Sequence, residues 1–129
     1  MPRTEEGKAG FNMKALMADF VTAKECVDQR LKEYMIYDEP LLNVLIESID
    51  YSLFSGGKRV RPLFCFIVGE LFGVKKEQLI SLAFAVEMIH TASLIMDDLP
   101  HMDNAEVRRG KPANHMIFGQ DVASLASIG

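Results

Sequence analysis

The strongest constraint on the fold is a long helical repeat that stops at a proline. Residues 77–99 form the longest periodic block of the chain, with apolar side chains at Leu79, Leu82, Ala83, Val86, Ile89, Leu94 and Ile95. This spacing is the period of one face of an α-helix. Pro100 ends the pattern, because proline cannot continue a helix. We therefore predict one long helix over residues 77–99 and expect it to be largely buried.

The same periodicity predicts further helices on both sides, over residues 11–35, 40–53 and 62–72 and onward from His115 or Asp121. Pro40 and Pro62 suit the first turn of a helix, and Gly56 and Gly73 suit the residues after the last turn. The apolar run 64–68 could equally form a buried strand, but no partner strand is evident elsewhere, so we prefer a helix. The pattern predicts an all-α bundle.

Two polar segments are predicted to lie outside the helices. Residues 1–10 contain two glycines and are expected to be flexible. Residues 104–114 contain Gly110 and Pro112 among charged side chains and are expected to form a solvated connection. The last residues, 121–129, begin a helical pattern that stops without a polar cap, so we interpret the chain as cut.

Composition and charge exclude several classes of protein. The 129 residues are 49% hydrophobic and 25% charged, as in soluble globular domains. The formal net charge of −4 disfavours binding of nucleic acid over the whole surface. Cys26 and Cys65 stand alone without metal-ligand spacing and no signal-peptide pattern opens the chain, so we expect a reducing, cytoplasmic location. Glu87 and His90 interrupt the most apolar stretch, so no transmembrane helix is expected.

The first chemistry-bearing cluster follows the long helix, in the sequence D-D-L-P-H-M-D. Asp97 and Asp98 lie in the predicted last turn, where the helix dipole disfavours carboxylates, so helix stability does not explain them. Asp103 follows just past Pro100 and can fold back toward them. The three carboxylates would form the oxygen-only cluster that Mg²⁺ accepts. A solvated acidic turn is the alternative interpretation.

Two basic clusters suit compact anionic ligands. Arg108 and Arg109 follow the carboxylates, and guanidinium groups bind phosphates through paired hydrogen bonds, so this arrangement indicates a polyphosphate. The second cluster is G-G-K-R-V-R-P at residues 56–62, which contains Lys58 and Arg61. Here glycines let the backbone approach an anion, and the following helix adds amide donors. A solvated basic loop is the alternative for each cluster.

His90 precedes Asp97 by seven residues on the predicted long helix. Two turns of helix place these residues within about 20° of the same face. His90 could therefore point into the same cavity as the aspartates. A satisfied core histidine is the alternative.

These segments resemble, in order along the chain, the motifs of the trans-prenyl diphosphate synthases, especially the geranylgeranyl and farnesyl diphosphate synthases. The matching segments are residues 57–62, 89–100, 102–104 and 108–112. The resemblance implies the all-α isoprenoid-synthase helical bundle, a homodimer, and head-to-tail trans condensation of isopentenyl diphosphate with an allylic diphosphate. Family members are considerably longer and carry a second aspartate-rich motif on a later helix. Residues 1–129 are thus expected to be the N-terminal portion of a single domain and to be inactive alone.

The resemblance also implies a role for individual residues. Magnesium would be held by Asp97, Asp98 and Asp103, which with Arg108 form the implied catalytic set. The substrate diphosphates would be bound by Lys58, Arg61, His90, Arg108 and Arg109. Of these, Arg108 would neutralise the departing allylic diphosphate, and the other four would clamp isopentenyl diphosphate. Two small side chains before the aspartates, Ala92 and Ser93, imply a product of twenty carbons or more, such as geranylgeranyl diphosphate.

Two residues depart from the family pattern, and three alternatives stay open. Met96 stands where a histidine is common, and Gln120 where an acidic residue is frequent. The alternatives are a farnesyl diphosphate synthase, a non-catalytic prenyl-synthase-like regulatory subunit, and a cyclase or head-to-head synthase of the same fold. The intact aspartates and arginines argue against the regulator. The segment 57–62 argues against the cyclase, which needs no clamp for isopentenyl diphosphate.

Overall fold

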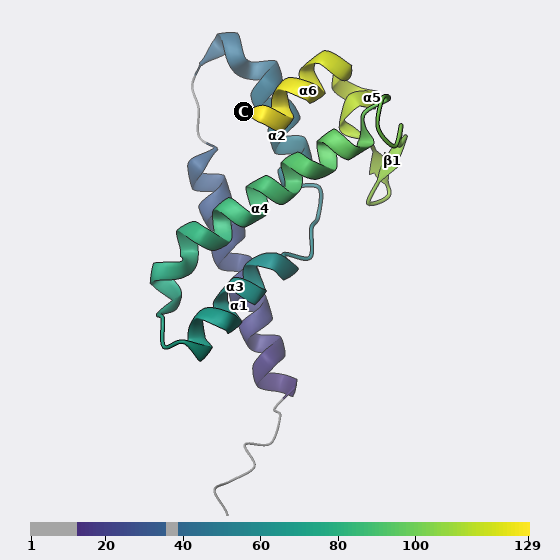
Figure 1. Ribbon diagram of the computed structural model, residues 1–129. Coiled ribbons are helices and arrows are strands. Elements are labelled where there is room, and N and C mark those ends of the chain that lie inside the picture. The colour runs from purple at the N-terminus through teal and green to yellow at the C-terminus, as the bar shows by residue number, and fades with distance from the viewer. Residues whose placement is uncertain (1–12, 36–38) are drawn as a thin grey trace, which may run out of the picture.

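Helix α4 (Lys76–Asp98) packs against every other α-helix of the computed structural model, which describes residues 13–35 and 39–129. The order of elements is α1 (Met13–Tyr34), the 3₁₀ turn η1 (Pro40–Leu42), α2 (Asn43–Leu53), α3 (Val60–Leu71), α4 (Lys76–Asp98), β1 (Val107–Arg108), β2 (Lys111–Pro112), α5 (Asn114–Phe118) and α6 (Gln120–Ile128). In Figure 1, α1 and α3 lie along the first half of α4, and α2, α5 and α6 surround its second half. The all-α prediction is confirmed apart from a small hairpin. The segment 1–10, predicted to be flexible, lies outside the described residues.

The first core cluster joins α1, the end of α2, α3 and the first half of α4. Its buried members are Ala23, Val27, Leu31, Leu53, Phe66 and Ala83. Three of them follow the four-residue spacing of α1, as the sequence predicted. Complete burial of a valine or leucine side chain contributes roughly 1.5–3 kcal/mol. This spacing therefore determines which face of α1 packs inward.

The second core cluster lies at the other end of α4, against α6. It contains Ile95, Leu99, Ala123 and Ala126. Small alanines on α6 let that helix approach α4 closely. Ile49 of α2 packs against both clusters and so connects the two ends of the molecule.

The buried face of α4 differs from the prediction. Its buried residues are Ala83, Glu87, Thr91, Ile95 and Asp98, spaced by four and then three. The apolar side chains of Leu82 and Ile89 are instead 54% and 70% exposed, because the described helices pack on the other face. The prediction of a largely buried helix is therefore wrong within the described residues.

By length and composition, α4 is the single helix among the described residues that could cross a membrane, and core helices meet the same criterion. Its inward face carries two acids, Glu87 and Asp98, and each is in an ion pair with an arginine. A bilayer would have to accommodate both pairs.

The shorter helices differ from the predictions mainly at their ends. Residues 64–68 are helical, as preferred, but α3 begins at Val60, two residues before Pro62. Pro40 opens a 3₁₀ turn rather than an α-helical one. The predicted last helix is divided in two by Gly119, whose φ of 87° is incompatible with a continuous helix.

The connection at residues 104–114 contains a two-stranded hairpin that the sequence analysis missed. Val107 pairs with Pro112 and Arg108 with Lys111 in antiparallel register. The turn residues Arg109 and Gly110 both have positive φ, which matches the twist of a tight hairpin. The hairpin therefore presents two consecutive arginines, one on a strand and one in the turn.

A polar network, buried around Asn114 of α5, anchors α5 and the hairpin to α2. The Asn114 side chain donates to the Ser48 carbonyl at 2.7 Å and to Ser52 Oγ at 2.8 Å. Ser48 Oγ donates in turn to Asn114 Oδ1 at 2.7 Å. The Tyr51 hydroxyl donates to the Pro112 carbonyl at 2.7 Å. Loss of one partner would leave buried polar groups unpaired, at a cost of roughly 1–3 kcal/mol, so the hairpin is held firmly.

Candidate functional site

The carboxylates stand at the end of α4, where the sequence analysis placed them. Asp97 and Asp98 are its last two residues. The Asp103 amide donates to the Asp97 carbonyl at 2.8 Å, so the chain folds back over the helix end as predicted. The residues Asp97 and Asp103 are exposed, whereas Asp98 is buried. Asp98 is therefore enclosed by the protein, whereas Asp97 and Asp103 are open to solvent and free to contact a ligand.

Asp98 forms a two-pronged ion pair with Arg108. Arg108 Nε donates to Asp98 Oδ2 at 2.9 Å, and Nη2 donates to Oδ1 at 2.6 Å. This hydrogen bonding raises the pKa of Arg108 above its ordinary value, with smaller contributions from the charges of Asp98, Asp97 and Asp103. Burial explains the pairing, because a carboxylate exposed over only 3% of its side chain needs a charged partner. Asp98 thus orients Arg108.

The three carboxylates do not converge as predicted. Within residues 13–35 and 39–129 no group of three histidine, cysteine, aspartate or glutamate side chains could hold a metal ion. The reason is that both oxygens of Asp98 face Arg108. Asp97 and Asp103 remain exposed, and neither is in an ion pair with another described residue. Two such oxygen donors suit Mg²⁺, which keeps waters and takes phosphate oxygens as its other ligands.

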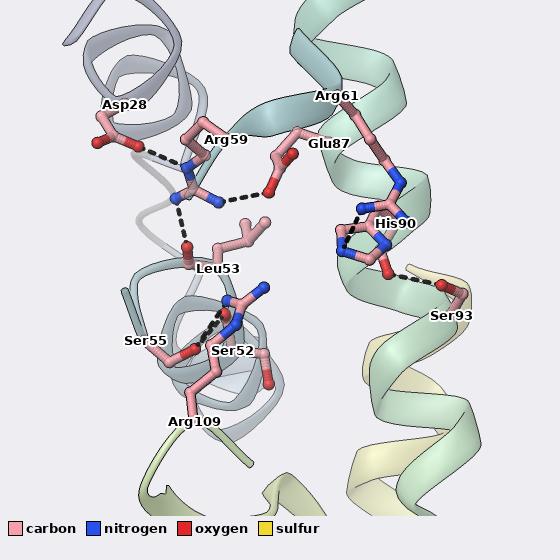
Figure 2. A network of polar contacts seen from close by, with 10 residues as sticks. All are labelled: Asp28, Ser52, Leu53, Ser55, Arg59, Arg61, Glu87, His90, Ser93 and Arg109. Carbon is pink, nitrogen blue, oxygen red and sulfur yellow. Dashed lines mark hydrogen bonds and ion pairs between the residues drawn. The ribbon is translucent and has the colours of Figure 1, made fainter. Parts of the chain in front are cut away.

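A second site is lined by basic side chains from three separate parts of the chain. Its pocket of about 440 Å³ is bordered by Gly56, Lys58, Arg59, Val60, Arg61, Glu87, His90 and Arg109. The loop between α2 and α3 supplies Lys58, and the hairpin turn supplies Arg109. All four residues that the resemblance assigns to isopentenyl diphosphate therefore meet at one pocket. Figure 2 shows this region, with His90 and Arg61 facing Arg59 and Arg109.

His90 belongs to this basic pocket and not to the carboxylate cluster. Arg61 Nη1 donates to His90 Nε2 at 3.0 Å. Arginine cannot accept, so Nε2 accepts and the ring proton lies on Nδ1. Burial, followed by the charge of Arg61, lowers the pKa of His90. Asp97, seven residues and about 10 Å farther along the helix, is not among the residues that border this pocket.

Arg108 and Arg109 serve different sites although they are adjacent. Arg109 Nη1 donates to Ser55 Oγ at 3.4 Å, away from Asp98. Burial, then the charge of Arg59, lowers the pKa of Arg109. Arg109 also borders a small pocket with Asp98 and Arg108, so it lies between the two sites. The two arginines of the predicted pair therefore contact different partners, Asp98 for Arg108 and Ser55 for Arg109.

The sequence analysis missed the buried network around Arg59. Its Nε donates to Asp28 Oδ1 at 2.7 Å, its Nη1 to Glu87 Oε1 at 2.8 Å, and its Nη2 to the Leu53 carbonyl at 2.6 Å. Figure 2 shows the three acceptors arranged around one guanidinium. A signal was present, because Glu87 is an acid inside the apolar repeat of α4 and must have a partner if it is buried.

The two residues expected to set product length have different surroundings. Ala92 borders an apolar pocket of about 230 Å³ between α4, α2 and α6. Ser93 is exposed, and its hydroxyl donates to the His90 carbonyl at 2.7 Å. Ala92 alone of the two thus faces a space that an apolar chain could enter. Met96 and Gln120, the departures from the family pattern, are both exposed.

The chain belongs to the polyprenyl synthetase family, whose model matches residues 42–128. It is 52% identical over 117 residues to the chloroplastic geranylgeranyl pyrophosphate synthase of Capsicum annuum. That match covers 90% of this chain and 30% of the pepper protein. The chain therefore spans about a third of the length of the curated relatives it matches.

Solved structures agree with this assignment. The geranyltranstransferase of Thermotoga maritima is similar with a TM-score of 0.79 and 47% identity, covering 85% of this chain and 41% of that one. An FPP/GFPP synthase of Zymomonas mobilis gives a TM-score of 0.83 at 35% identity, covering 88% of this chain and 41% of that one. The fold of the described residues is therefore the helical isoprenoid-synthase fold.

Proposed function

We propose that the full-length protein is a prenyltransferase that elongates an allylic diphosphate with isopentenyl diphosphate, head to tail and in trans geometry. The observation that carries the proposal is the division of Arg108 and Arg109 between two anion sites. One site has exposed carboxylates suited to a metal, and the other is bordered mainly by basic side chains, with Glu87 as its one acid. A reaction with two diphosphate substrates, only one of which loses its diphosphate, needs this asymmetry.

The residues at the end of α4 would act on the departing group. Mg²⁺ bound there would neutralise the charge that develops on the leaving diphosphate. Asp97 and Asp103 would hold the metal, and Arg108, oriented by Asp98, would donate hydrogen bonds to the diphosphate oxygens. An allylic carbon–oxygen bond breaks more readily when this charge is compensated.

The basic pocket would hold the substrate whose diphosphate is retained. Lys58, Arg61 and Arg109 supply fixed positive charge. His90, neutral through its lowered pKa, would lend hydrogen bonding without a full charge. A rigid clamp suffices at this site, because no bond to that diphosphate is broken.

For the product, we infer geranylgeranyl diphosphate, with twenty carbons, in preference to farnesyl diphosphate. Ala92 supports this, because its small side chain leaves the adjacent apolar pocket open. Substitution Ala92→Tyr should fill the pocket and shorten the product, whereas Ser93→Tyr, on the exposed side, should shorten it less. Farnesyl diphosphate as the sole wild-type product would contradict the inference.

We also infer a homodimer located in the cytoplasm. Exposed apolar side chains of α3, at Phe64, Val68 and Leu71, support an association surface. The cytoplasmic location rests on the two cysteines, which are free in the structure. Sedimentation velocity and imaging of a full-length fluorescent fusion test these two points.

The central experiment is an assay of the full-length protein with isopentenyl diphosphate and allylic primers of five, ten and fifteen carbons. We expect product formation that requires Mg²⁺ and stops with EDTA. Binding of both diphosphates without any turnover would instead favour the regulatory-subunit alternative, and turnover of the allylic substrate alone would favour a cyclase.

A further inference from the structure

We propose that Arg59 is a positioning residue that builds the basic pocket, and not one of the cations that bind the diphosphate. This inference rests on the proposed function, because it concerns the pocket assigned to isopentenyl diphosphate. Arg59 stands between Lys58 and Arg61 in one basic run, so the sequence makes the three look equivalent. Their surroundings in the structure are different.

The guanidinium of Arg59 is occupied by the protein itself. Each of its three nitrogens donates to an acceptor, namely Asp28, Glu87 and the Leu53 carbonyl. The Arg59 side chain is 3% exposed and that of Glu87 is 2% exposed. Two carboxylates thus offset one positive charge, so Arg59 contributes little net attraction to an anion. Its favourable interactions are already made inside the fold.

Those contacts join the α2–α3 loop, which borders the pocket, to three helices. Asp28 lies on α1, Leu53 ends α2, and Glu87 lies on α4 one turn before His90. The backbone of Arg59 has a φ of 55°, and its carbonyl accepts from the Leu63 amide at 3.2 Å in the first turn of α3. Arg59 therefore fixes the point from which Lys58 and Arg61 diverge.

Gly57 gives the network a second link to the pocket. A Cβ at this position would lie 3.1 Å from a guanidinium nitrogen of Arg109 and 3.2 Å from one of Arg59. Both guanidiniums thus rest against the same piece of backbone. If Arg59 shifted, this loop would move, and the place of Arg109 in the pocket would change with it.

Substitution Glu87→Gln gives a test in which two explanations predict opposite signs. Glu87 borders the basic pocket, so removing its negative charge should tighten anion binding if simple electrostatics decide the outcome. If Arg59 acts by positioning, exchanging its charge-assisted hydrogen bond for a weaker neutral one should weaken binding instead. We expect at least 5-fold weaker binding of isopentenyl diphosphate and of inorganic pyrophosphate, measured by calorimetry on the full-length protein in EDTA.

Two further variants and one control complete the design. Asp28→Asn loosens Arg59 from outside the pocket, and Arg59→Lys keeps the charge but lacks the planar guanidinium that reaches three separated acceptors. Both should weaken binding in the same direction. Glu70→Gln removes an exposed charge elsewhere on α3 and should have no effect. In steady-state assays of Glu87→Gln, Asp28→Asn and Arg59→Lys, the KM for isopentenyl diphosphate should rise. The kcat and the KM for the allylic substrate should stay within 2-fold of the wild-type values.

The outcomes separate this inference from the proposed function. Tighter or unchanged binding in Glu87→Gln would overturn the positioning role while leaving the prenyltransferase proposal intact. If Glu87→Gln does not fold, unchanged binding in Asp28→Asn and Arg59→Lys would overturn it equally. A wild-type protein that binds neither isopentenyl diphosphate nor pyrophosphate would overturn both proposals.

Discussion

The two candidate sites differ in how the chain builds them. The carboxylate site comes from one continuous segment, with Asp97, Asp103 and Arg108 brought together by a helix end and the turns after it. The basic pocket joins the α2–α3 loop, α4 and the hairpin turn, and a buried arginine holds it. A local site depends on few contacts outside itself, whereas an assembled site depends on the packing of the whole fold. Substitutions at the carboxylate site should therefore change turnover with little change in stability. Substitutions around the basic pocket should change both substrate binding and stability.

The largest effect should come from Asp97→Ala in the full-length protein. We expect turnover to fall at least about 1,000-fold, equivalent to about 4 kcal/mol, because the proposed Mg²⁺ would lose one of its two exposed ligands. The free energy of unfolding should change by no more than about 0.5 kcal/mol, as is usual for an exposed position. The control is Asp121→Ala, at another exposed aspartate. Near-normal kcat in Asp97→Ala would contradict the metal assignment.

The ion pairs of the two regions should differ in their contribution to stability. Arg59→Ala leaves Glu87 and Asp28 without their partner inside the fold and should cost about 3–5 kcal/mol. Arg108→Ala should cost less, about 1–2 kcal/mol, because Arg108 is 35% exposed and its removal lets water reach Asp98. Urea unfolding followed by circular dichroism measures both. Equal losses would mean that the two regions do not differ in this respect.

The cations of the basic pocket should affect one substrate selectively. Lys58→Ala and Arg61→Ala should each raise the KM for isopentenyl diphosphate about 10- to 100-fold, which matches loss of one or two charge-assisted hydrogen bonds. The KM for the allylic diphosphate should change less than about 3-fold, because the carboxylate site stays intact. Equal changes in both constants would show that the two sites are not separate.

The smallest effect concerns the charge of His90. Its pKa lies below the ordinary value of about 6.5, so the neutral ring stabilises the fold at pH values above 6.5. That contribution is lost as the pH falls through the lowered pKa. A bound diphosphate should raise this pKa, so binding below pH 6.5 should take up protons. Calorimetry in buffers of different ionisation enthalpy should show less uptake in His90→Gln, and identical uptake would exclude His90 as the acceptor.

Local sequence signals predicted most of the helices. Ion pairs between residues far apart in the chain could not be predicted from the sequence. The ends of α4 were predicted within one residue, because a proline and a long periodic repeat define them. The hairpin was missed, since two-residue strands are too short to produce a period. The pairing of Arg59 with Asp28 and Glu87 joins residues 31 and 28 positions apart, and no local pattern encodes it.

The candidate site shows the same contrast between local signals, which the sequence reveals, and long-range contacts, which it does not. Sequence reasoning placed Asp97, Asp103 and Arg108 together, because turns and helix ends are local. The shared helix face indicated that His90 could point into the same cavity as the aspartates, and the resemblance grouped it with Lys58, Arg61 and Arg109. The packing of the α2–α3 loop against α4 brings His90 to Arg61.

The left-handed backbone of Arg59 has a consequence for redesign of this loop. A designer guided by backbone geometry would choose glycine or asparagine at a φ of 55° and would gain roughly 1–2 kcal/mol of conformational relief. The same exchange would delete a side chain that hydrogen-bonds to α1, the end of α2 and α4 at once. At this position the residue that suits the main chain is the wrong one for the molecule, so stabilisation schemes that score each site by its torsion angles should leave Arg59 unchanged.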